Sequence, residues 1–228
     1  MSVRLRILTA NLWKGAACPA ALARLVAEEG VDVACLQELD WAQADALAEV
    51  LPYGRLEPSL RGGMGIALRQ PAKLGWLPLP FRSIRAARLD PKHWPGLSEP
   101  VCVWNLHVRA PHTGWPLRSA RLRRRQLRGV LRYLERPVAP RLVLVGDFNA
   151  TPVWPFYREV AKRIPDVALE HARARDERPA RTWGPWHGAP RLLRIDHAFA
   201  RGVGVEAVRR VRLAGSDHDG LLIDVALG

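Results

Sequence analysis

Short apolar runs and amphipathic stretches follow one another along the chain. The runs have the length and the β-branched content of strands, and turn residues bound most of them. They predict eight strands, over residues 3–11, 31–39, 63–69, 100–108, 141–147, 194–200, 205–213 and 220–227. Apolar residues at helical spacing predict four helices, over residues 19–30, 41–51, 117–136 and 154–163.

The order of these elements favours one class of architecture. Helices and strands are mixed without a regular alternation, and several strands late in the chain follow one another as hairpins do. This favours sheets packed together with helices outside over a single parallel sheet with regular crossovers. No repeat, low-complexity linker or Gly/Ser tract divides the 228 residues, of which 48% are hydrophobic. We therefore expect one domain over residues 1–228 with a substantial core.

The start of the chain mixes charged and apolar residues, so it lacks the apolar centre of a secretion signal. No apolar run approaches the length of a membrane-spanning helix. We expect a cytoplasmic protein without stable membrane association, and a monomer. The cysteines Cys18, Cys35 and Cys102 have neither the number nor the spacing of a disulfide framework or a zinc site, so reduced thiols are expected.

The chain is strongly basic, with a formal net charge of +13 and an isoelectric point near 11.0. Such an excess of positive charge attracts polyanions, among them nucleic acid and acidic membrane surfaces. Nearly all of the 35 basic residues are arginine, and a bias of this kind also arises from codon composition. The charge therefore favours a polyanionic partner without identifying it.

Polar side chains recur at the ends of the predicted strands. In "LVLVGDFNATP" (142–152), side-chain alternation places Asp147 and Asn149 on one face of the extended chain and Phe148 on the other. The polar residues at the other strand ends are Asn11, Glu38, His107, Asp196 and the run Ser216, Asp217 and His218. Each of them alone is explained by a turn or a satisfied polar group. Together they supply several oxygen ligands and two imidazoles, which favours a functional site.

Six segments occur in a characteristic order: "TANLW" (9–13), "CLQEL" (35–39), "NLHV" (105–108), "GDFNATP" (146–152), "RIDHAF" (194–199) and "SDH" (216–218). In order and approximate spacing they resemble the endonuclease/exonuclease/phosphatase superfamily, and the resemblance extends from about Leu5 to Val225. It implies an α+β fold, a four-layer α/β-β/α sandwich of two packed mixed β-sheets with helices on the outer faces. Members are divalent-metal-dependent phosphoesterases, among them nucleases, abasic-site endonucleases, lipid and inositol phosphatases and sphingomyelinases.

The resemblance also implies a metal site and a water-activating group. Glu38 would be the principal ligand of Mg²⁺ or Mn²⁺, with Asn11 and Asp217 close by, since oxygen ligands suit these cations. Asp147 would orient or deprotonate the attacking water, and Asn149 would donate to a phosphate oxygen. Neutralising the phosphate charge and activating the water are central requirements of this hydrolysis.

Two histidines complete the site that the resemblance implies. His218 would face the phosphate, and Asp196 would fix its tautomer and favour its protonated form. His107 matches the second imidazole of deoxyribonuclease-like and sphingomyelinase-like members and would donate a proton to the leaving group; a buried strand histidine is the alternative. The chain departs from the family pattern after His218, where Asp219 and Gly220 stand in place of a residue followed by proline.

We therefore expect a divalent-metal-dependent phosphodiesterase that hydrolyses phosphodiester bonds in nucleic acid, in the manner of an endonuclease. The alternative is a phosphatase or phosphodiesterase for a small-molecule or lipid phosphoester, because the same central residues serve both. A catalytically silent binding module is disfavoured because every central position is filled. Trp183 and Trp186, in a Pro/Gly loop, leave two interpretations open: stacking on a base or anchoring of the loop.

Overall fold

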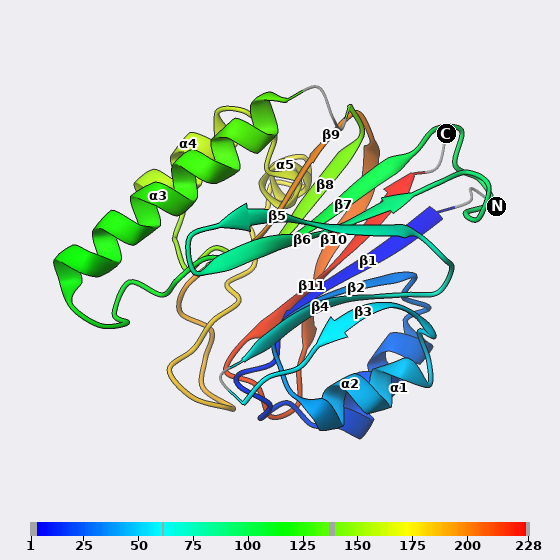
Figure 1. The fold of residues 1–228 in the computed structure, drawn as a ribbon, viewed down its shortest axis with the longest axis horizontal. Helices are drawn as coiled ribbons and strands as arrows, with labels where there is room; N and C mark the ends of the chain where they lie inside the picture. The colour runs from blue at the N-terminus through cyan, green and yellow to red at the C-terminus, as the bar shows by residue number, and fades with distance from the viewer. Residues whose placement is uncertain (1–3, 61, 137–139, 227–228) are drawn as a thin grey trace.

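Two β-sheets form the centre of the protein (Figure 1). The computed structural model describes residues 4–60, 62–136 and 140–226. Sheet 1 consists, in spatial order, of β10 (Gly204–Arg212), β11 (Asp219–Ala226), β1 (Arg4–Asn11), β2 (Val33–Leu39), β4 (Gly63–Leu68) and β3 (Tyr53–Glu57). Sheet 2 consists of β5 (Lys73–Leu79), β6 (Arg82–Leu89), β7 (Val101–His107), β8 (Leu142–Asp147) and β9 (Asp196–Arg201). β1 and β2 run parallel, as do β7 and β8, and the other neighbouring strands are antiparallel.

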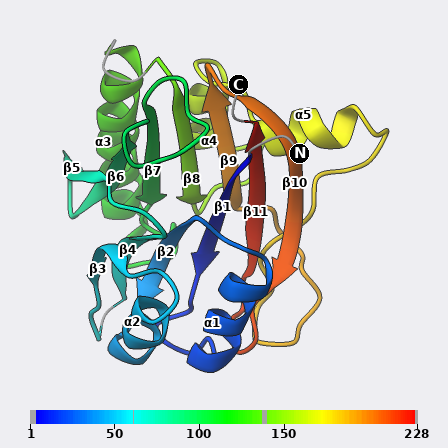
Figure 2. The same cartoon turned by 90° about the vertical axis from the view of Figure 1, so that its right-hand side faces the viewer.

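Helices cover the outer faces of both sheets (Figures 1 and 2). α1 (Pro19–Glu28) and α2 (Trp41–Ala48) lie against sheet 1, and α3 (Pro116–Glu135) and α4 (Pro155–Ala161) lie against sheet 2. α5 (Val167–Arg173) packs against the edge strands β9 and β10. The predicted four-layer sandwich of two mixed sheets is confirmed.

Three apolar cores separate these layers. The core between the sheets contains aliphatic side chains from both of them, among them Ile7, Val103 and Ile223. Leu8 points to the other side of sheet 1 and packs into the core under α1 and α2, while Phe148 lies in the core between sheet 2 and its helices. Because both faces of the central strands are buried, these strands have nearly continuous apolar sequences.

The predicted elements are all present, with ends that differ by a few residues, and residues 3 and 227 of the predicted strands lie outside the described ranges. Sequence analysis missed β3, β5, β6 and α5. β3 and β5 are edge strands whose side chains are mostly exposed or half-buried. β5 also contains Gly75 and Pro78, and β6 contains three arginines. These strands therefore lack the apolar alternation on which strand prediction depends.

α3 carries polar groups on its buried face as well as apolar ones. It begins with Pro116, whose missing N–H would find no intrahelical partner at that position. Leu122 and Val130 face sheet 2, and the buried side also includes Arg123 and Gln126, whose polar ends bond to the loop that follows β7. None of the described helices combines the length and the apolar character needed to cross a membrane.

The strand ends with polar residues meet at one end of the sandwich. In sheet 2, His107, Asp147 and Asp196 are direct neighbours across β7, β8 and β9. Gly146 precedes Asp147 with a φ of +138°, and a Cβ at Gly146 would lie 1.9 Å from the carbonyl oxygen of Leu106. Only glycine fits this approach of β8 to β7, so Gly146 places Asp147 at the edge of the sheet.

Candidate active site

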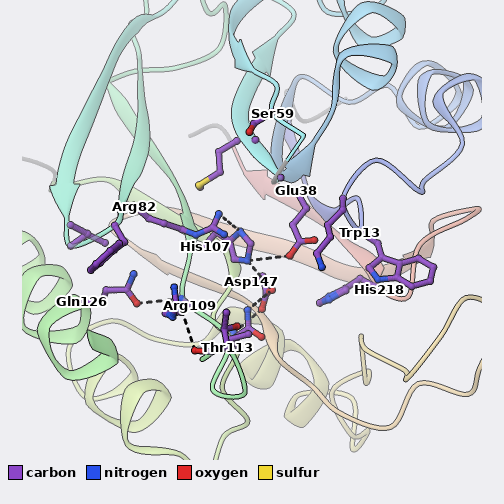
Figure 3. A pocket seen from close by; sticks show the side chains of 18 of the residues that line it. Trp13, Glu38, Ser59, Arg82, His107, Arg109, Thr113, Gln126, Asp147 and His218 are labelled. Carbon is purple, nitrogen blue, oxygen red and sulfur yellow. Dashed lines mark hydrogen bonds and ion pairs between the residues drawn. The ribbon is translucent and has the colours of Figure 1, made fainter. Parts of the chain in front are cut away.

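A cavity of about 990 Å³ opens at this end of the sandwich (Figure 3). Six of the eight residues that the sequence predicted for the site line it: Glu38, His107, Asp147, Asn149, Asp217 and His218. The other two, Asn11 and Asp196, are buried and bond to lining residues. The structure thus brings all eight together from both sheets.

His218 is buried and paired with Asp196. Its Nδ1 lies 2.8 Å from Asp196 Oδ2, and its backbone N–H donates to the Ser216 hydroxyl at 3.0 Å. Burial alone would lower the pKa of His218, but the charges of Asp196, Asp147 and Asp217 outweigh it and raise the pKa to about 9. The ring is therefore a cation at neutral pH, with Nε2–H as a donor on the side away from Asp196.

Asp147 is 1% exposed and accepts three hydrogen bonds. Its Oδ2 accepts from Asn11 Nδ2 at 3.0 Å and from Asn149 Nδ2 at 2.8 Å, and its Oδ1 accepts from the Asn149 backbone N–H at 2.7 Å. Burial and the charge of Asp196 nevertheless raise the pKa of Asp147 to about 7. The side chains of Asp147 and Asn149 lie on one side, as the alternation predicted.

Asn149 and Asn11 orient this carboxylate. Asn149 has a φ of +47°, and its amide nitrogen also donates to the Val108 carbonyl at 3.0 Å, so both amide hydrogens are in use. Asn11 Oδ1 accepts from the backbone N–H of Trp13 at 3.0 Å. The structure therefore gives Asn149 a positioning contact with Asp147, whereas the expected donation to a phosphate oxygen would require one of these bonds to be exchanged.

His107 has a cation as its neighbour. Nη1 of Arg82, the first residue of β6, lies 2.9 Å from Nδ1 of His107. Since a guanidinium only donates, Nδ1 accepts and the ring carries its proton on Nε2, which lies 3.6 Å from Glu38 Oε1 and 3.5 Å from Asp147 Oδ2 (Figure 3). Burial, with the charges of Arg82 and His218, holds the pKa of His107 well below 6.5. His107 is thus a neutral hydrogen-bond donor, a state that does not fit the expected proton transfer to the leaving group.

Glu38 and Asp217 present carboxylate oxygens to the same cavity. Asp217 Oδ2 accepts from Trp183 Nε1 at 3.0 Å, while Asp217 Oδ1 is buried without a hydrogen-bond partner in the described ranges. Burial raises the pKa of Asp217. An orphaned carboxylate oxygen beside further oxygen donors fits a hard divalent cation, which would favour the ionised form. Asn11, Glu38 and Asp217 are therefore suited to hold Mg²⁺ or Mn²⁺.

A second group of ligand atoms lies beside this set. It consists of Asp147, Asp196 and His218, each of which has one potential ligand atom within 4.8 Å of those of the other two. Within the described ranges, no other group of three His, Cys, Asp or Glu side chains comes this close. His218 Nδ1 is already bonded to Asp196 at 2.8 Å. In this structure the group is therefore a hydrogen-bonded pair beside the carboxylate of Asp147.

After His218, where the sequence departs from the family pattern, an arginine holds the chain in place. Asp219 pairs through Oδ1 with Nη2 of Arg191 at 2.8 Å. The same guanidinium donates to the carbonyl oxygens of Ser216, Asp217 and His218 at 3.1, 2.8 and 3.2 Å. Arg191 thus holds the segment that carries the metal-side carboxylate and the charged imidazole.

Three arginines of this region escaped sequence analysis: Arg82, Arg109 and Arg191. Arg82 belongs to a strand that the apolar pattern did not predict, and no motif marks the other two. The structure favours loop anchoring for Trp183, because its indole N–H bonds Asp217, whereas Trp186 is 61% exposed.

Comparisons with solved structures agree on the fold. The human Nocturnin catalytic domain, with bound sulfate anion, has a TM-score of 0.72 at 18% identity, covering 100% of this chain and 97% of that one. D. rerio TDP2 complexed with a single-strand DNA product has a TM-score of 0.74 at 19% identity, covering 97% and 98%. The 3′ phosphatase NExo from Neisseria, bound to a product DNA hairpin, has a TM-score of 0.70 at 19% identity, covering 96% and 98%. A search of curated protein sequences finds no match.

The sequence itself matches a family profile. The profile of the Endonuclease/Exonuclease/phosphatase family matches residues 8–218, a span that runs from β1 to the charged imidazole of the cavity. The chain therefore belongs to the Endonuclease/Exonuclease/phosphatase family.

Proposed function

We propose that the protein is a divalent-metal-dependent phosphodiesterase whose preferred substrate is nucleic acid. Its family and fold support a phosphoesterase. The observation that carries the finer assignment is that one cavity holds both the imidazole of His218, bonded to Asp196 at 2.8 Å, and the carboxylates of Glu38 and Asp217, which suit a divalent cation. A phosphodiester has a single negative charge and a poor alkoxide leaving group, so its hydrolysis needs donors at more than one oxygen.

The residues of the cavity divide the chemistry between them. Asp147 accepts the proton of the attacking water, and its bonds from Asn11 and Asn149 keep it oriented for that task. The charged Nε2–H of His218 donates to a phosphate oxygen, where negative charge grows in the transition state. Asp196 keeps His218 in the tautomer and orientation that this donation requires.

The oxygen donors define the place of the metal. A divalent cation held by Asn11, Glu38 and Asp217 would supply Lewis-acid stabilisation of the phosphate and of the departing oxygen. His107 directs its Nε2–H toward Glu38 and Asp147 and keeps both carboxylates on the cavity side. It acts as a neutral orienting group.

Three observations support nucleic acid as the substrate. The cavity of about 990 Å³ is at the upper end of the ~300–1,000 Å³ that single small ligands need. The net charge of +13 attracts polyanions. Two solved structures with the same fold hold DNA products, D. rerio TDP2 and Neisseria NExo.

A substrate panel tests the proposal. Plasmid, single strands, an abasic duplex, RNA, an aryl diester and an aryl monoester are each incubated with Mg²⁺, Mn²⁺ or a chelator. We expect metal-dependent cleavage of nucleic acid, and Glu38→Gln should raise the metal concentration needed for half-maximal rate. Glu28→Gln, an exposed carboxylate on α1, is the matched control. Full activity in chelator, or faster turnover of the monoester than of any nucleic acid, would overturn the proposal.

A lipid or small phosphoester is the second candidate, and one observation favours it. The hairpin of β5 and β6 exposes Trp76 and Phe81, which are 60% and 83% exposed, and Phe81 lines the cavity. An apolar group at the cavity mouth suits a substrate with an apolar tail. Phospholipid vesicles and a soluble short-chain phosphodiester in the same panel separate this candidate from the first.

Three expectations from the sequence stay predictions: one domain over residues 1–228, a monomer and a cytoplasmic location. Size-exclusion chromatography with light scattering measures the molar mass in solution, against 25.5 kDa for one chain. A single unfolding transition followed by two spectroscopic probes would support one domain.

A further inference from the structure

One wall of the cavity carries two guanidinium groups, those of Arg82 and Arg109, that bond directly to no carboxylate in the described ranges. Arg82 donates to the ring of His107, and Arg109 donates to the carbonyl oxygen of Thr113 at 3.1 Å. Neither guanidinium forms an ion pair in the part of the chain that the structure describes. By contrast Arg85, which lies on the same strand as Arg82 and lines the same cavity, is paired with Glu57. The charges of Arg82 and Arg109 are thus available to a ligand.

A buried glutamine fixes this wall. Gln126 on α3 is 0% exposed, and its Nε2 donates to the Pro80 carbonyl at 3.1 Å in the turn that precedes Arg82. Its Oε1 accepts from the backbone N–H of Arg109 at 3.2 Å. One side chain therefore ties both arginine-bearing segments to the same helix. Such a fixed arrangement reduces the entropy that the arginines lose when a ligand binds.

The arrangement is costly in the absence of an anion. Burial lowers the pKa of Arg82; the charges of Glu38 and Asp147 oppose this only in part, and the positive charge of Arg109 adds to it. A guanidinium that is partly desolvated next to another cation is destabilised unless an anion is bound to it. Phosphate suits such a place, because a guanidinium can donate two parallel hydrogen bonds to its oxygens.

The wall is separate from the site of cleavage. Arg82 contacts Nδ1 of His107, whereas the carboxylates of Glu38 and Asp147 lie at Nε2, on the other side of the ring (Figure 3). An imidazole ring therefore stands between Arg82 and the groups that act on the scissile phosphate. An anion held by the arginine wall is a different group of the substrate.

We propose that Arg82 and Arg109 form a second anion subsite, which binds a phosphate adjacent to the scissile phosphodiester of the same substrate. The inference builds on the proposed function, since it assumes that the scissile group lies at Asp147 and His218. The group that binds at this subsite is a phosphate one nucleotide away from the scissile phosphodiester. This phosphate is either the next diester of a strand or a terminal phosphate.

Substrates with and without a second phosphate test the subsite. A trinucleotide offers a neighbouring diester, a phosphorylated dinucleotide offers a terminal phosphate, and bis(4-nitrophenyl) phosphate offers neither. Arg109→Gln is the decisive variant, because Arg109 does not contact His107, and Arg82→Gln is the second. Arg128→Gln, on the exposed face of α3, removes the same charge elsewhere and is the control.

We expect Arg109→Gln to raise KM about 10- to 100-fold for substrates with a second phosphate, which corresponds to the loss of a charge-assisted hydrogen bond. Turnover of bis(4-nitrophenyl) phosphate should change less than about twofold, as should every rate of Arg128→Gln. An effect on the trinucleotide alone assigns the site to an internal phosphate, and an effect on the phosphorylated dinucleotide alone assigns it to a terminal one. Equal losses on all substrates, or no loss on any, would overturn the proposal.

Binding without turnover separates this proposal from the proposed function. In chelator, the fluorescence anisotropy of a labelled phosphorylated dinucleotide and of a labelled trinucleotide reports affinity while no bond is cut. If wild-type protein binds either of them and Arg109→Gln does not, the subsite holds even when the panel detects no diesterase. If wild-type protein and Arg109→Gln bind both equally, the subsite is wrong even when the protein is an active nuclease.

Discussion

Two histidine–aspartate pairs lie on opposite faces of strand β9. Asp196 faces the cavity and bonds His218 at 2.8 Å. The next residue, His197, faces the helix layer, where it contacts Phe148, Tyr157 and Phe199, and its Nδ1 lies 3.7 Å from Oδ2 of Asp166. Both histidines are buried next to a carboxylate, yet the surroundings push their pKa values in opposite directions.

The difference lies in what else the carboxylate contacts. Asp166 is paired with Arg194 and accepts from Tyr157 Oη at 2.7 Å, so its charge is already balanced, and burial lowers the pKa of His197. Asp196 has no arginine partner in the described ranges, and its charge, with those of its neighbours, raises the pKa of His218 to about 9. Whether the histidine of such a pair is charged or neutral thus depends on the other groups that contact the carboxylate.

The largest loss of activity is expected from a substitution of His218. His218→Gln removes the charged donor, so kcat should fall about 100- to 10,000-fold, as is typical of a general acid or an oxyanion donor. The thermal midpoint should change little by comparison. Steady-state kinetics on an oligonucleotide, together with thermal unfolding, measure both quantities. A variant with wild-type kcat would show that His218 lies outside the chemistry.

A smaller loss is expected from the partner on the same face of β9. Asp196→Asn keeps the shape of the pair but removes the charge that favours the imidazolium, so kcat should fall about 10- to 100-fold. The double variant with His218→Gln should be no slower than His218→Gln alone, because both changes affect one unit. Additive losses in this double-mutant cycle would contradict that assignment.

On the other face of β9, His197 should affect stability and leave kcat unchanged. His197→Gln disturbs ring contacts with Phe148, Tyr157 and Phe199 and the 2.8 Å contact of Nε2 with the Ala150 carbonyl. We expect a loss of about 1–3 kcal/mol in the free energy of unfolding. Urea titration gives this value, and a kcat change as large as that of His218→Gln would abolish the distinction between the two faces.

The smallest effect is a pH dependence of stability. Burial would raise the pKa of Asp166, but the neighbouring His197 ring and Arg194 outweigh it and hold the pKa below 3.8, so its contribution is lost as pH falls below about 4. His197, whose pKa is lowered, takes up a proton on unfolding below about pH 6.5, which destabilises the fold in the same direction.

Urea titration from pH 7 to pH 5 measures the contribution of the histidine. Each group contributes at most about 1.4 kcal/mol per pH unit. The slope should be shallower in His197→Gln, which has no group to titrate there. Identical slopes in the two proteins would show that His197 does not titrate on unfolding.

The sequence predicted the residues of the candidate site better than the residues that hold them in place, for a physical reason. Asn11, Glu38, His107 and Asp147 lie at the ends of apolar strands, so their position at a sheet end is encoded locally. Arg82 lies on a polar strand near the edge of sheet 2, and only the tertiary fold brings it to His107.

The protonation states of the two site histidines differed in how far they could be predicted. Asp196 beside His218 followed from the family pattern, and the structure has that pair. The lowered pKa of His107 follows from its burial and from the charge of Arg82, whose strand has too little apolar pattern to be found. Arg191, one of the two arginines paired with Asp219, likewise lies in a loop with no sequence signal.

Hydrogen bonds that cross from one sheet to the other have a consequence for how the protein is made. Asn11 on β1 bonds Asp147 on β8 at 3.0 Å, and Gln37 on β2 bonds Asn105 on β7 at 2.6 Å. A nascent chain translated only as far as β8 contains these four residues, but β1 still lacks its neighbour β11 and the cavity lacks His218. The candidate site is therefore completed only after the segment that carries His218 and β11 has been made, because β11 lies between β1 and β10.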